Sequence, residues 1–155
     1  MLKLKFLCMR HRRWLQENRS AAPARWEQAY SSGLVFFEAN NYLLAVRHAG
    51  TAFEISELLL GEHSTLTQRD INRFTDSATL LVHIMYRLNE TRLANEVRAD
   101  AIDRLESLGS CGGHCQTALQ RCRRSLLSGV YAPKLNTLMT TDPLQAATKW
   151  PIQIH

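Results

Sequence analysis

The sequence has few residues that interrupt helices and no long apolar run. Only seven glycines and four prolines occur among its 155 residues. Three of the prolines lie beyond residue 130, so the middle of the chain is almost free of strong helix breakers and favours helices. No apolar stretch approaches the roughly 20 residues that a membrane-spanning helix needs. We therefore expect a soluble, mainly helical protein.

The motifs of several common enzyme classes are also missing. The chain has no G-x-x-x-x-G-K-[ST] phosphate loop, no G-x-G-x-x-G turn and no G-x-S-x-G elbow. Its histidines show no H-E-x-x-H spacing. The acidic residues Glu54 and Glu57 share one helix face, but such pairs are most often solvated surface. We expect a protein that is not an enzyme and has no cofactor.

The start of the chain lacks the features of a secretory signal. Two lysines precede a very short apolar patch, and basic residues follow where small residues and a cleavage site would stand. We therefore expect a cytoplasmic protein. Its four cysteines are then expected to be reduced thiols.

A helical period is the strongest feature that the sequence does contain. Apolar residues recur at three- and four-residue steps between residues 25 and 38. Asn40 and Asn41 then predict a turn, because asparagine tolerates the left-handed backbone. The period resumes at Tyr42 and continues to Leu59, with small residues where a neighbouring helix would approach. The pattern predicts two antiparallel helices.

The spacing of this hairpin resembles the tetratricopeptide repeat, a helix-turn-helix family with a 34-residue unit. The resemblance covers residues 26–60 and rests on Gly33, Phe36, Tyr42, Ala45 and Ala52. The chain departs from the family at Ala29, Ser32 and Ala49, where larger residues are usual, and no proline follows Ala52. A weaker echo exists, since residues 89–94 resemble residues 40–45 at a spacing longer than the standard unit.

The resemblance implies an all-α fold of antiparallel helical hairpins, stacked as a short tetratricopeptide-like array or as an irregular bundle of about five helices. It also implies an adaptor that binds a protein or an extended peptide in the groove between helix pairs. Near the matched hairpin, the candidate contact residues are Phe37, Asn40 and Arg47. Homodimerisation is compatible with this fold, because a short array leaves apolar end faces.

Three regions are expected along the chain. Residues 1–22 form a basic N-terminal segment that is compatible with a short strand, an amphipathic helix or a loose tail. Residues 23–129 form the helical domain, and residues 130–155 form a tail that contains proline. Within the domain, Thr67 and Asp70 predict the start of a third helix. Its wide apolar stripe predicts that this helix is the central one.

Two further helices are predicted in the second half of the domain. Thr91 is a candidate cap for a fourth helix, which the glycine-rich stretch from Gly109 ends. A fifth helix is expected from about His114 to Leu127 by its apolar period.

Two alternative functions come from other residues. The chain carries a formal net charge of +5, and an arginine-rich cluster near its start suggests a regulator that binds nucleic acid. That cluster consists of Arg10, Arg12, Arg13 and Trp14. A small protein stabilised by zinc is the other alternative. Its candidate ligands are Cys111, His114, Cys115 and Cys122.

Overall fold

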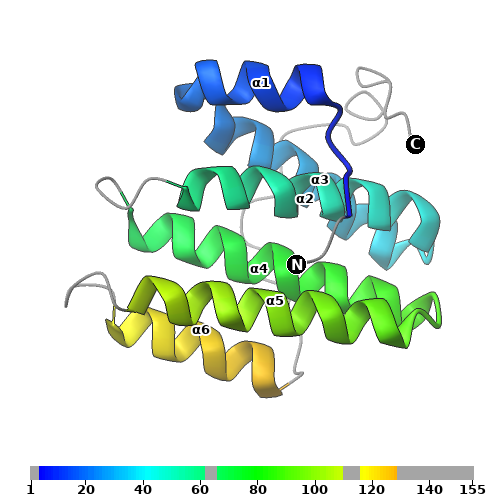
Figure 1. Ribbon diagram of the computed structural model, residues 1–155. Helices are drawn as coiled ribbons and strands as arrows, with labels where there is room; N and C mark the ends of the chain where they lie inside the picture. The colour runs from blue at the N-terminus through cyan, green and yellow to red at the C-terminus, as the bar shows by residue number, and fades with distance from the viewer. Residues whose placement is uncertain (1–3, 62–65, 110–115, 129–155) are drawn as a thin grey trace.

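The structure is a computed structural model that describes residues 4–61, 66–109 and 116–128. In these ranges the chain forms helices and no strand, which confirms the all-α fold class. Figure 1 shows the helices stacked in chain order. They are α1 (Met9–Glu17), a short 3-10 helix η1 (Arg19–Ala21), α2 (Ala22–Glu38), α3 (Tyr42–Leu60), α4 (Gln68–Arg87), α5 (Thr91–Gly109) and α6 (Gln116–Ser128).

The number of α-helices in the described ranges exceeds the predicted five by one. The extra helix is α1, which forms in the N-terminal segment where the sequence left three conformations open. The last predicted helix is present as α6 and begins at Gln116. His114, its expected first residue, and the tail over residues 130–155 lie outside the described residues.

The two helical hairpins turn at asparagine residues in the left-handed conformation. Asn40 has a φ of 57° between α2 and α3, and Asn89 has a φ of 62° between α4 and α5. Asparagine adopts this backbone more readily than most residues. The side chain of Asn41 then accepts a hydrogen bond from the backbone N–H of Leu44 at 3.3 Å, which caps α3. The predicted turn at residues 40 and 41 is confirmed.

The start of α4 is a capping box. The Thr67 hydroxyl oxygen accepts from the backbone N–H of Asp70 at 3.2 Å, and the Asp70 carboxylate accepts from the backbone N–H of Thr67 at 3.3 Å. This reciprocal pair satisfies two donors that the helix terminus would otherwise leave unbonded. The carboxylate also suits the positive end of the helix dipole. The predicted start of the third helix is therefore confirmed.

Helices α2 and α3 pack with their backbones close together. A methyl group added at Gly33 of α2 would lie 3.1 Å from the backbone nitrogen of Ala49 in α3. It would also lie 3.4 Å from a methyl carbon of Leu80 in α4. Three alanines of α3 are fully buried at spacings of three and four residues, namely Ala45, Ala49 and Ala52. Small side chains thus let the hairpin close and let α4 reach it.

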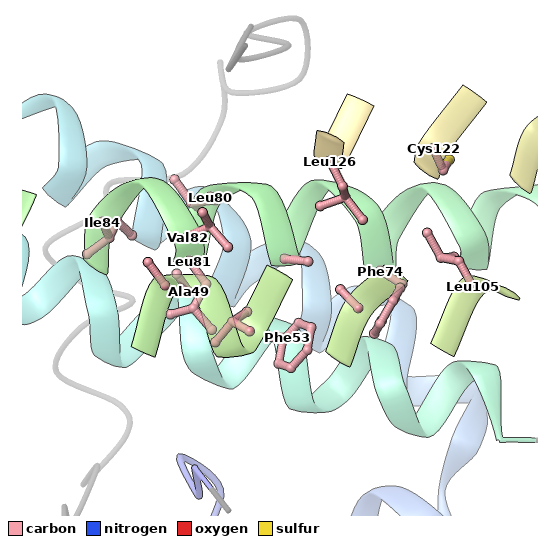
Figure 2. Packing of buried hydrophobic residues seen from close by; sticks show 14 of the residues in the cluster. Ala49, Phe53, Phe74, Leu80, Leu81, Val82, Ile84, Leu105, Cys122 and Leu126 are labelled. Atoms are coloured by element: carbon pink, nitrogen blue, oxygen red, sulfur yellow. The ribbon is translucent and has the colours of Figure 1, made fainter. Parts of the chain in front are cut away.

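Helix α4 is the central helix, as its wide apolar stripe predicted. It contacts α2, α3, α5 and α6. In the core, the Phe74 ring of α4 stacks on the Phe53 ring of α3 with centroids 5.3 Å apart. Figure 2 shows this pair together with Leu105 of α5 and Leu126 of α6, which close the other sides of the same cluster.

The contacts place α2, α4 and α6 in one row. Helix α4 contacts α2 on one side and α6 on the other, and α6 also contacts α5. Helices α3 and α5 each pack on the helix that precedes them. The structure is therefore a bundle built from successive antiparallel helices, and α2, α4 and α6 form a continuous row.

We expect Gly33→Leu to destabilise the protein, because its side chain has no room between α2 and α3. Overpacking of a filled core typically costs about 1–3 kcal/mol of unfolding free energy. Ala24→Leu is the matched control, since Ala24 is exposed in the same helix. Urea denaturation monitored by circular dichroism measures both. Equal stability of the two variants would show that the hairpin tolerates a larger spacing.

Candidate functional site

One face of α4 carries a strip of half-buried polar residues that the hydrophobic core does not cover. The strip consists of Asn72, Asp76, Thr79 and His83, which recur at steps of four, three and four residues and are all half-buried. Such steps place side chains on one helix face. The opposite face of α4 carries fully buried apolar residues, including Ala78 and Leu81. The strip therefore lies on the accessible side of the central helix.

Contacts to the neighbouring helices locate this strip within the row. Ser77 of α4 accepts a hydrogen bond from the Trp26 indole of α2, with 2.7 Å between Nε1 and Oγ. Asn72 lies toward α6, because the Cys122 thiol is 3.7 Å from its Oδ1 atom. The polar strip is therefore flanked by α2 on one side and α6 on the other.

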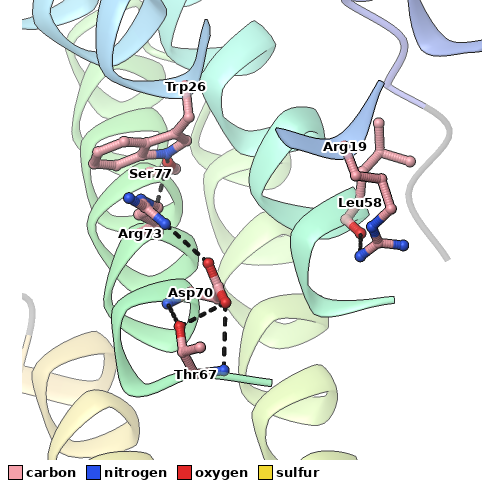
Figure 3. A network of polar contacts seen from close by, with 7 residues as sticks. All are labelled: Arg19, Trp26, Leu58, Thr67, Asp70, Arg73 and Ser77. Atoms are coloured by element: carbon pink, nitrogen blue, oxygen red, sulfur yellow. Dashed lines mark hydrogen bonds and ion pairs between the residues drawn. The ribbon is translucent and has the colours of Figure 1, made fainter. Parts of the chain in front are cut away.

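A polar network holds α2 against α4 beside the strip. Arg73 forms an ion pair with Asp70 at 2.9 Å, and its guanidinium lies 5.6 Å from the centre of the Trp26 ring. The Tyr30 ring stacks on the Trp26 ring, with the two ring centroids 4.9 Å apart. Figure 3 shows the chain of contacts from Thr67 through Asp70 and Arg73 to Trp26. Fixed partners on both helices make this flank of the strip rigid.

The histidine at the end of the strip favours its neutral form. Burial lowers the pKa of His83, and the nearby guanidinium groups of Arg98 and Arg87 lower it further. A neutral imidazole has one donor and one acceptor nitrogen. The strip thus contains an amide, a carboxylate, a hydroxyl and a neutral imidazole. The Thr79 hydroxyl already donates to the carbonyl oxygen of Thr75 at 2.7 Å, so its oxygen is left as an acceptor.

The candidate contact residues of the hairpin lie away from this strip. Phe37 packs against Tyr42 with ring centroids 5.9 Å apart, and the Asn40 side chain accepts a hydrogen bond from the Tyr42 hydroxyl at 2.7 Å. Both residues serve the turn between α2 and α3. Arg47 lies on α3, where its carbonyl oxygen accepts from the Thr51 hydroxyl at 2.9 Å. Phe37 lies in the last turn of α2, Asn40 in the turn that follows and Arg47 on α3, so none of the three is on α4.

The arginine-rich cluster of α1 is divided between two sides of that helix. Arg10, Arg13 and Trp14 line an open recess, where Arg25 of α2 joins them with its guanidinium 5.9 Å from the centre of the Trp14 ring. Arg12 faces α3 instead. Burial raises the pKa values of Glu54 and Glu57, and the charge of Arg12 opposes that rise. Sequence spacing gave no signal for Arg25, since it lies in another helix.

Glu54 of α3 is buried, which corrects the expectation that it is solvated. Only 2% of the residue is exposed. Its carboxylate accepts the backbone N–H groups of Phe6 at 2.6 Å and Leu7 at 3.1 Å. Burial raises the pKa of Glu54, and these two hydrogen bonds oppose that rise. A carboxylate on α3 thus holds the extended segment that leads into α1.

Further apolar and polar contacts hold α1 and the residues on either side of it against α3. The Phe6 ring lies directly on Gly50, where any side chain would overlap it. Leu15 of α1 is 3% exposed and packs with Ile55 of α3. Arg19 donates a hydrogen bond to the carbonyl oxygen of Leu58 at 3.3 Å, which Figure 3 also shows. These contacts fix α1, and the recess beside it, relative to the bundle.

The zinc hypothesis falls mostly on residues that the structure does not describe. Cys111, His114 and Cys115 lie outside the described residues. Cys122 lies on α6 and is 5% exposed, within the hydrophobic core. Among the described residues no group of three or more histidine, cysteine, aspartate or glutamate side chains is placed to hold a metal ion. Zinc binding stays a prediction that elemental analysis of the purified protein tests.

We expect Glu54→Gln to loosen the segment before α1. Glutamine has one acceptor oxygen where the carboxylate has two, so one buried N–H loses its partner at a cost of about 1–3 kcal/mol. Hydrogen exchange followed by mass spectrometry should show faster exchange in peptides that contain Phe6 and Leu7. Glu57→Gln is the matched control, because it removes a carboxylate one turn along α3. Unchanged exchange in the Glu54 variant would contradict this role.

The free energy of unfolding should fall as pH rises, because the partly buried Glu57 carboxyl group loses its proton in the folded protein. Burial raises its pKa above the ordinary value of 4.5, the carboxylate of Glu54 raises it further, and Arg12 opposes both. The folded protein therefore keeps this proton to higher pH than the unfolded chain does. The stabilisation is fully present below pH 4.5 and is lost as pH rises through the raised pKa.

Glu57→Gln should make the decrease in unfolding free energy with rising pH smaller, since the amide of glutamine does not titrate. Urea midpoints measured at a series of pH values test the prediction. Glu27→Gln, an exposed substitution in α2, should leave the fall as steep as in the parent protein. A pH profile that Glu57→Gln does not flatten would show that other groups cause the dependence.

Comparisons with known proteins identify no relative of this chain. No family model, no curated protein and no solved structure matches it. Among the described helices, none is both long and apolar enough to span a bilayer.

Proposed function

We propose that this protein is a non-enzymatic adaptor that binds an extended segment of another protein along the row formed by α2, α4 and α6. The half-buried polar strip on α4, which contains Asn72, Asp76, Thr79 and His83, carries the proposal. Phe37, Asn40 and Arg47 stay predicted contacts at the end of α2, at the hairpin turn and on α3, and the strip on α4 is the set that we propose in addition.

Two physical features support peptide binding at this strip. Its polar side chains recur at about one helical turn along α4, and an extended peptide presents backbone donors and acceptors in alternation. The strip also lies on the most enclosed helix of the bundle, between two neighbours that it contacts. A rigid surface loses little conformational entropy on binding, so more of the contact energy appears as affinity.

The tetratricopeptide-like character of the chain belongs to this same proposal. Stacked hairpins of that family present successive first helices as a row, and α2, α4 and α6 form a row of this kind. The buried alanines of α3 and the left-handed Asn40 are consistent with the hairpin of the resemblance. A cytoplasmic location is part of the proposal as well.

Blocking the strip should abolish partner binding. We expect Thr79→Arg to lower the amount of partner protein that is recovered by affinity purification by about tenfold or more. Substitutions at central positions of binding surfaces commonly have effects of this size. Ala99→Arg, at an exposed position of α5, is the matched control and should bind normally. A photoreactive amino acid at position 79 identifies the bound segment by mass spectrometry, and a synthetic peptide of that segment should then bind the purified protein.

Three outcomes would contradict the adaptor function. Equal recovery with both arginine variants would place the contact elsewhere, and loss of the partner on nuclease treatment would indicate a complex held by nucleic acid. Recovery of a second copy of this chain alone would indicate a homodimer, which light scattering would confirm. Circular dichroism of each variant shows whether the fold is intact.

A further inference from the structure

A positively charged recess lies between α1 and the start of α2, apart from the strip on α4. Its volume is about 450 Å³. Three guanidinium groups line it against a single carboxylate, so its field attracts anions. The lining residues are Arg10, His11, Arg13, Trp14, Glu17 and Arg25.

The basic side chains that α1 contributes to this recess are available for a ligand. Arg10 and Arg13 are both exposed, and neither forms an ion pair with another residue in the described part of the chain. Guanidinium groups bind phosphate oxygens through two parallel hydrogen bonds, which makes arginine well suited to phosphate recognition. The recess thus supplies the groups that a phosphate chain requires.

An aromatic surface accompanies these charges. Trp14 is 39% exposed, and the guanidinium of Arg25 lies 5.9 Å from its ring centre. The Arg25 side chain is itself held, since its Nη1 atom donates to Gln28 Oε1 at 3.3 Å. An indole ring beside arginines is the combination on which bases of single-stranded nucleic acids stack.

We propose that this recess binds single-stranded nucleic acid, with Arg10 and Arg13 on the phosphates and a base stacked against Trp14. Arg12 has no part in the site, because it does not line the recess. Arg25 takes its place from α2. The anchoring of the preceding segment by Glu54 keeps α1 in position, so the site is formed before a strand binds.

The geometry favours a nucleic-acid strand over an anionic membrane. A helix that lies in a membrane interface inserts its apolar face into the lipid. In α1 that face is already used, because Leu15 is 3% exposed and packs with Ala22 and Ile55. Met9 is exposed at the start of the helix, and Trp14 lines the recess five residues later. A concave, arginine-lined recess with a single tryptophan fits a phosphate and a base better than it fits a flat bilayer.

Binding of a short fluorescein-labelled oligothymidylate to the full chain tests the proposal by fluorescence anisotropy over a salt series. The logarithm of the affinity should fall against the logarithm of salt concentration with a slope of about −1.4, if Arg10 and Arg13 each neutralise one phosphate. Arg13→Glu should weaken binding by about tenfold and make the slope shallower. A duplex of the same length should bind more weakly.

The stacking contact has its own test. Trp14→Ala should weaken binding by on the order of tenfold with little change in the salt slope, whereas Trp14→Phe should keep most of the affinity. Arg69→Glu is the matched charge control, since Arg69 is exposed on α4 and does not line the recess. Arg69→Glu should bind the oligonucleotide with nearly the same affinity as the parent protein. Circular dichroism confirms that each variant is folded.

Several results would overturn the proposal. Absence of binding at low salt, equal weakening by Arg13→Glu and Arg69→Glu, or normal binding by Trp14→Ala would each do so. Binding to phosphatidylserine vesicles without binding to the oligonucleotide would assign the recess to a membrane. Displacement of the oligonucleotide by polyglutamate at equal charge concentration would assign it to acidic proteins. None of these results depends on Thr79→Arg, so this site and the adaptor function fail separately.

Discussion

The close approach of α2 to α3 at Gly33 and Ala49 is the constraint on which the rest of the bundle depends. Because Gly33 has no side chain, the two backbones approach until an added methyl group would lie 3.1 Å from the Ala49 nitrogen. The same gap admits Leu80 of α4. Helix α4 can therefore pack on both members of the hairpin, and α5 and α6 then pack on α4. The contact between α2 and α4 on one flank of the polar strip depends on this close approach, and the contacts of α6 with α4 and α5 form the other flank.

Features set by neighbouring residues could be predicted from the sequence. The turn at Asn40, the cap at Thr67 and the central place of α4 each depend on local backbone preferences or on one helical period. Even the weak echo between the two hairpins is reflected in the structure, since Asn89 repeats the left-handed turn of Asn40. The alanines at matching positions of the two hairpins are likewise fully buried, namely Ala45 with Ala94 and Ala52 with Ala101. Interactions between residues that are close in sequence are sufficient to determine these turns, caps and helices.

The candidate sites depend instead on residues far apart in the chain. Glu54 is buried because residues 48 and 47 positions earlier bring backbone N–H groups to it, whereas spacing alone suggested a solvated acidic pair. Arg12 and Arg13 are adjacent, yet one faces Glu54 and the other lines the recess. The orientation of α1 about its axis decides between them. That orientation follows from where Leu15 packs against Ile55, which no local pattern specifies.

The carboxylate of Glu54 is subject to two opposing demands. Its role as a double acceptor for Phe6 and Leu7 requires the charged form, since a protonated carboxyl group has one oxygen that donates. Burial favours the neutral form, and it outweighs the hydrogen bonds and the charges of Arg12 and Lys5 because the net effect is a raised pKa. An apolar residue here would avoid the desolvation cost but would leave both N–H groups without a partner. The buried charge is therefore best understood as the anchor that orients α1, and through it Arg10, Arg13 and Trp14.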